Sequence, residues 1–101
     1  MSTDDAGLLQ DAADRLERLA ARTTAGDWRI SGLLASRPEV IAHAADGGTE
    51  HVAEARAGTS AWIAALSPAI AGPLVAWLRA AAEAPSPAAL ELARALRNRL
   101  P

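Results

Sequence analysis

Two histidines, His43 and His51, are the residues best suited to metal binding or acid–base chemistry, and they flank a turn containing Gly47-Gly48. The residues on both sides of this turn alternate as strands do, and glycine supplies the positive φ that tight hairpins require. A two-residue loop would point the histidines to opposite faces of the hairpin, whereas a three-residue loop would place them directly across from each other. The chemistry of this pair therefore depends on the hairpin register.

In the second register Asp46 or Glu50 would be near enough to act as a third ligand. A protein metal site usually needs three or four ligands in a defined geometry, and the sequence offers no further ones. We therefore expect two ordinary strand histidines, with no metal and no cofactor.

Catalysis through a nucleophile is not indicated either. The chain has no cysteine, and its serines and threonines mostly fall where a helix cap or a turn explains them. No Gly-x-Ser-x-Gly elbow, phosphate-binding glycine loop or carboxylate pair is present. We predict that the protein is not an enzyme.

Three arginines near the end of the chain, Arg94, Arg97 and Arg99, form its most basic feature. Cations in the last turn of a helix interact favourably with the helix dipole, which is their ordinary role. The formal net charge is −2 and lysine is absent, so the chain lacks the overall basic charge of a typical nucleic-acid binder. A nucleic-acid-associated regulator using this arginine face is the alternative function, and direct nucleic-acid binding is not the leading expectation.

The densest apolar stretch, residues 58–83, organises the rest of the chain. Its second half is apolar nearly all round, which is typical of a helix enclosed by other elements or by another subunit. We expect the tryptophans mainly to fill the core. Excess apolar surface nevertheless predicts a protein-binding face, with self-association possible, whose candidate residues are Leu74, Val75, Trp77, Leu78, Leu92, Leu96 and Leu100, together with the three arginines.

The elements that would position these residues follow from periodicity. Apolar residues recurring at three and four predict helices over 4–25, 59–66, 68–83 and 87–99, with caps at Thr59, Ser67 and Ser86. Three short antiparallel strands are expected between residues 27 and 57. The order predicts a single α+β domain over 1–101, with two to three C-terminal helices packed on one face of a three-stranded sheet.

Two places leave alternatives open. Leu33 and Leu34 could extend the first strand or lie in a loop. Pro73 falls beyond the first turn of a helix that begins at residue 68, so this helix must kink at Gly72-Pro73 or begin afresh at Pro73.

Composition and hydropathy bear on location and origin. No apolar run of about 18 uninterrupted residues is apparent and the start of the chain is acidic, so neither membrane spanning nor export is predicted and we expect a cytoplasmic protein. The bias toward alanine and arginine is typical of a GC-rich, actinobacterial coding sequence.

The chain resembles the small ead-like phage and prophage proteins and related actinobacterial domains of unknown function. The resemblance covers about residues 8–83 and rests on Gly-x-Trp-x-Ile at 26–30, Val-Ala-Glu at 52–54, Trp-Ile-Ala-Ala at 62–65, Ser67-Pro68 and the Leu-rich helix at 74–78. The sequence departs from that pattern at Asp27, at Trp62 and at the added Gly72-Pro73. The resemblance implies this architecture and a mobile-element origin, and it carries no catalytic residues.

Overall fold

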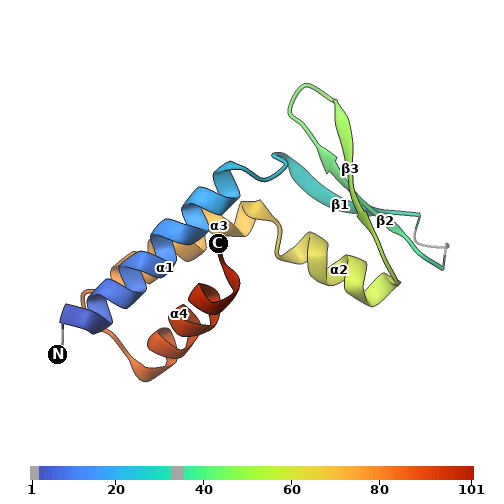
Figure 1. Cartoon of the computed structure of the whole chain (residues 1–101). Coiled ribbons are helices and arrows are strands. Elements are labelled where there is room, and N and C mark those ends of the chain that lie inside the picture. The colour runs from blue at the N-terminus through green and yellow to red at the C-terminus, as the bar shows by residue number, and fades with distance from the viewer. Residues whose placement is uncertain (1–2, 33–35) are drawn as a thin grey trace. The chain divides into compact units, whose positions relative to one another are not determined.

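The computed structural model describes residues 3–32 and 36–101, and its elements follow the predicted order (Figure 1). An N-terminal helix precedes a three-stranded antiparallel sheet, and helices follow, so the α+β class is confirmed. The elements are α1 (Thr3–Ala21), β1 (Asp27–Ser31), β2 (Glu39–His43), β3 (Thr49–Glu54), α2 (Ala57–Ala65), the 3-10 turn η1 (Pro68–Ile70), α3 (Ala71–Ala81) and α4 (Pro87–Arg99). The question raised by Leu33 and Leu34 lies outside the described residues.

The chain divides into two compact units, where the sequence predicts one domain. Unit 1 comprises residues 1–22 and 71–101, and unit 2 comprises residues 23–70. The sheet therefore shares its unit with α2, whereas α3 and α4 belong with α1. The expectation that the C-terminal helices pack on the sheet holds for α2, and α3 and α4 pack on α1 instead.

Unit 1 is a helical unit in which α1 contacts both α3 and α4. Its core consists mainly of small side chains, which allow helices to approach closely. The buried residues are Leu9, Ala12, Ala13, Val75, Leu78, Ala82, Ala89 and Ala93. The stripe predicted for the first helix therefore meets those of the third and fourth.

The ends of the helices in unit 1 follow local chemistry. The Ser86 hydroxyl accepts the backbone N–H of Ala89 at 3.2 Å, as expected of an N-cap. Helix α3 begins at Ala71, so Pro73 falls in its first turn, where a missing N–H loses no helical bond. The structure is therefore close to the alternative in which the helix begins afresh at Pro73. Residues 68–70 form a separate 3-10 turn, and α3 begins at Ala71.

Unit 2 is built on a sheet with strand order β1-β2-β3. Val40 and Ala42 alternate on its buried face, and α2 packs on this sheet through β1 and β2. Helix α2 begins at Ala57 after Arg56, so Thr59 is not its cap, and no side chain caps it. Its anchor is Ser60, which is fully buried and whose hydroxyl lies 3.0 Å from the Ala55 carbonyl oxygen and 3.1 Å from that of Pro38.

The helical stretch Ala57–Ala81 is, by length and composition alone, apolar enough to cross a membrane. The expectation concerned uninterrupted apolar runs, and serines, glycines and prolines interrupt this stretch without adding charge. Residues 57–78 contain no charged side chain. In the structure the stretch is divided among α2, η1 and α3.

Candidate functional site

The hairpin register places the two histidines differently from either predicted arrangement. The Ala44 N–H donates to the Gly48 carbonyl at 2.8 Å, and the Gly47 N–H donates to the Ala44 carbonyl at 3.0 Å. The loop is therefore the three residues 45–47, and Gly47 takes a φ of 90°. This loop lies one residue earlier in the chain than the three-residue loop that would have paired the histidines.

The strand pairs follow from that turn. His43 faces Thr49, and His51 faces Ile41. The histidines thus lie on the same face of the sheet at diagonal positions, not directly opposite each other. Among residues 3–32 and 36–101, no group of three or more His, Asp or Glu side chains is arranged to hold a metal ion.

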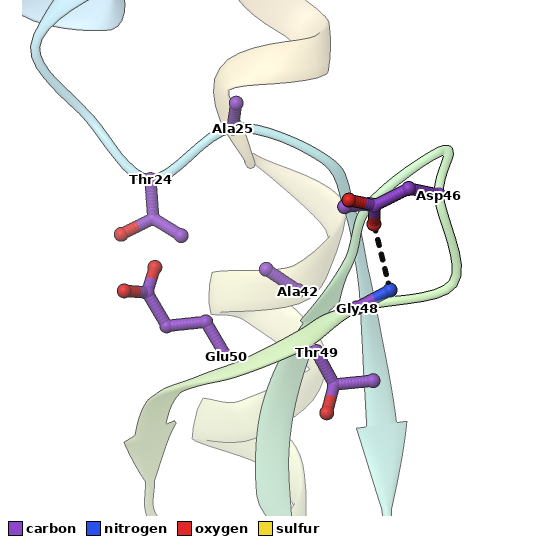
Figure 2. Close-up of a pocket in the computed structure, with 8 residues that line it drawn as sticks. Thr24, Ala25, Ala42, Asp46, Gly48, Thr49 and Glu50 are labelled. Carbon is purple, nitrogen blue, oxygen red and sulfur yellow. Dashed lines mark hydrogen bonds between the residues drawn. The ribbon is translucent and has the colours of Figure 1, made fainter.

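A shallow hollow of about 260 Å³ lies beside this turn. Its polar lining comes from Thr24 before β1 and from Asp46, Thr49 and Glu50 on the hairpin (Figure 2). Figure 2 shows the Glu50 carboxylate pointing toward Thr24. One Asp46 oxygen accepts the Gly48 N–H at 2.8 Å. The hollow offers exposed hydrogen-bond acceptors beside two threonine hydroxyls.

The candidate binding face predicted on α3 and α4 is largely core. Val75 and Leu78 are buried against α1, and Leu74, Leu92 and Leu96 pack partly buried around them. The prediction of an exposed binding face is therefore wrong for Val75 and Leu78, because the apolar stripe of α3 packs inside unit 1. Trp77 is the large member of the predicted face that stays well exposed, at 47% of its surface.

The exposed apolar surface lies instead on α2 and η1. Trp62 is 68% exposed, Leu66 is 54% exposed and Ile70 is 41% exposed. These three residues, spaced four apart, are called the α2 ridge below. They belong to unit 2, and no charged residue interrupts them.

Trp62 was expected to fill the core, and this expectation is wrong, because the side chain is mostly exposed. The buried polar residues of this stretch are Ser60 on α2 and Ser67 just after it. Ser60 faces the sheet, where its hydroxyl can donate to the Ala55 or the Pro38 carbonyl oxygen and so has a buried hydrogen-bond partner. The orientation of α2 that buries Ser60 leaves Trp62 exposed.

The predicted arginine face is partly used inside unit 1. The Arg97 Nε lies 2.7 Å from Asp11 Oδ2, and that oxygen also lies 3.0 Å from Arg15 Nε. Asp11 and Arg15 are spaced four apart on α1 and form an i,i+4 pair. Arg99 donates to the Ala95 carbonyl at 3.2 Å, which satisfies a helix C-terminus. Because Arg97 is paired with Asp11 inside unit 1, its positive charge is less available to a binding partner than the sequence suggests.

A second ion-pair group links α1 to α3. Arg79 lies 3.0 Å from Asp14 and 3.2 Å from Glu17. The pKa of Arg79 is raised above its ordinary value because its guanidinium donates hydrogen bonds first to Glu17 and then to Asp14. Within α1, local spacing would pair Asp14 with Arg18, four residues on, so the interhelical contact with Arg79 could not be found from local spacing.

No match to this chain was found among protein-family models, curated proteins or solved structures.

Proposed function

We propose that this protein is a small non-enzymatic accessory protein that acts by binding another protein through the α2 ridge. The observation that carries the proposal is the exposure of Trp62, Leu66 and Ile70 within one uncharged segment of unit 2. Large exposed apolar groups are typical of interaction sites, and tryptophan is enriched among binding hot spots.

The size of the ridge indicates its role in an interface. The three exposed side chains present on the order of 300 Å² of apolar surface, whose burial is worth roughly 7 kcal/mol at 25 cal/mol per Å². Association itself costs about 4–15 kcal/mol. The ridge therefore fits the centre of a larger contact whose rim comes from the surrounding polar residues.

A phage or mobile-element origin in an actinobacterial host is part of this proposal. Its support is the resemblance carried by the Gly26–Ile30, Val52–Glu54 and Trp62–Ala65 segments. The cytoplasm remains the proposed location. Ser60, Val75 and Leu78 within the 57–81 stretch are buried in their own units, which supports a folded role for the stretch. Because 22% of its most apolar window is buried, the membrane-spanning alternative is kept for the test below.

The test is affinity capture from a high-GC actinobacterial lysate with three proteins in parallel: the unmodified protein, the double variant Trp62→Ser/Leu66→Ser, and the control Trp77→Ser. Trp77 is also an exposed tryptophan, but it lies on unit 1. We expect a stoichiometric partner that the unmodified protein and the control retain and the ridge variant loses. Retention of the partner by the ridge variant would contradict the proposal.

Two further arms separate the alternatives. Nuclease treatment that removes everything captured would favour the nucleic-acid regulator, and Arg94→Ala/Arg99→Ala would then abolish retention in a salt-dependent way. Recovery of the protein in the membrane pellet would instead identify 57–81 as a membrane segment.

A further inference from the structure

The edge of β1 that faces away from β2 is an open edge of the sheet in unit 2, and the β1–β2 pairing is regular. Among the strands of residues 3–32 and 36–101, β1 lies next to β2 alone. All five residues of β1 pair with β2 in continuous register, whereas the β2–β3 pairing is irregular at Val40/Ile41. Bulges commonly protect sheet edges from further pairing, and β1 has no bulge and no proline.

The hairpin hydrogen bonds indicate which backbone groups this edge presents. Ala44 bonds to Gly48, so alternation along an antiparallel ladder makes Ala42 and Glu50 the next bonded pair. The backbone of Ala42 thus points to β3, and the N–H and C=O of Trp28, which stands opposite Ala42, point away from β2. Trp28 therefore offers one donor and one acceptor to an incoming strand.

The side chains around Trp28 are self-complementary. Asp27 and Arg29 lie on the face of β1 opposite to Trp28; their side chains pair with each other, Arg29 Nε to Asp27 Oδ2 at 2.7 Å, and both are 63% exposed. A second copy of β1 that runs antiparallel with the two Trp28 residues opposite each other would bring Asp27 of each copy against Arg29 of the other. Cross-strand pairs of opposite charge are stabilising, and a foreign strand would need the same acid-x-base pattern to match them.

The opposite face of this seam is apolar. Trp28 is half-buried, and its indole Nε1–H donates to the Thr24 carbonyl at 3.0 Å, which fixes the ring. Opposed residues of an antiparallel pair have Cβ atoms about 4.5–5.5 Å apart, a spacing at which aromatic rings interact. The seam would thus combine backbone hydrogen bonds, two charge pairs and one aromatic pair.

From these observations we propose that two copies of this protein associate through antiparallel pairing of β1 with β1, centred on Trp28, to form a continuous six-stranded sheet. The interface is two-fold symmetric, because the same strand supplies both sides. The inference uses β1 and not the α2 ridge, so it goes beyond the binding function proposed above, and each can fail without the other.

The test is a charge-exchange series followed by sedimentation equilibrium over a wide range of protein concentration. Asp27→Arg places an arginine opposite Arg29 of the other copy, and Arg29→Asp places a carboxylate opposite Asp27. We expect each single variant to weaken dimerisation by about tenfold or more, which corresponds to about 1.4 kcal/mol. The double variant Asp27→Arg/Arg29→Asp should restore it.

A mixture of the two single variants provides the sharpest readout, because a β1 strand with two basic side chains on this face would meet one with two acidic side chains. The mixture should form heterodimers more tightly than either variant forms homodimers. Circular dichroism of each variant checks that the fold is kept, and Trp62→Ser/Leu66→Ser should dimerise normally. A protein that stays monomeric at the highest concentration, or a dimer that all folded charge variants keep unchanged, would overturn the proposal, and a dimer lost only in the ridge variant would move self-association to α2.

Discussion

Replacing Ser60 by alanine should destabilise unit 2 by about 1–2 kcal/mol. Ser60 is fully buried, and its hydroxyl lies within hydrogen-bond distance of the Ala55 and Pro38 carbonyl oxygens, at 3.0 and 3.1 Å. Its single proton can serve one acceptor at a time, and the Pro38 oxygen also accepts the Ala55 N–H at 3.2 Å. The variant therefore chiefly deprives the Ala55 oxygen of a donor. Loss of a donor to a buried acceptor costs about 1–3 kcal/mol, and the better helix propensity of alanine offsets up to about 0.7 kcal/mol of this.

The measurement is urea unfolding in a Trp77→Phe background, so that the remaining tryptophans, Trp28 and Trp62, both report on unit 2. With a slope of about 1 kcal/mol per molar urea for so small a unit, the midpoint should fall by about 1–2 M. Ser31→Ala is the control, because Ser31 is exposed at the end of β1, and its effect should stay within about 0.5 kcal/mol. A midpoint for Ser60→Ala within 0.3 M of the parent, judged against roughly this slope, would refute the assignment of Ser60 as the anchor of α2.

Two other predictions concern the backbone before β1 and the ion pairs of α1. Gly26 has a φ of 110°, and a Cβ atom there would lie 2.8 Å from the His43 carbonyl oxygen, so Gly26→Ala should lower the free energy of unfolding by about 1–3 kcal/mol in the same urea assay, while Gly58→Ala, at a site with open space in the same unit, should not. Because the pKa of Arg79 is raised in the folded protein, its contribution to stability is fully present below the pKa of the unfolded chain and is lost only as pH rises through the higher folded pKa. Arg79→Met should therefore lower the thermal midpoint by the same amount at pH 7 and at pH 10, and a difference that vanishes between these pH values would contradict the role of Arg79.

The helices of unit 1 could be predicted from local sequence because their signals are local. The stripe of α1, the Asp11–Arg15 pair and the Ser86 cap each depend on residues three or four apart, and each is present in the structure. The three strands were likewise visible from alternation and from the glycines of the turn. The fold class followed from these elements.

The orientation of α2 could not be predicted in this way. Its apolar residues are spread around the helix, so hydrophobicity alone does not select an inner side. The choice is made by the hydroxyl of Ser60, which bonds to a carbonyl 22 residues earlier in the chain. A buried serine that exposes a tryptophan two positions later leaves no periodic signal, and the α2 ridge was missed for this reason.

The hairpin register and the burial of the candidate binding face likewise could not be predicted from residues close together in the sequence. The type of turn fixes the register, and moving the three-residue loop by one position separates His43 from His51. Val75 and Leu78 gave the correct apolar signal for α3, but only contact with α1 shows that this signal means core and not surface.

The central claim, that the α2 ridge is the protein-binding surface, is tested most directly by site-specific photo-crosslinking in cells. A photoreactive phenylalanine derivative is placed at Trp62, and in a matched control at Glu91, an exposed position on α4 of unit 1. The account predicts a discrete crosslinked protein from position 62 that is absent from position 91. No crosslinked protein from position 62, or the same products from both positions, would contradict it.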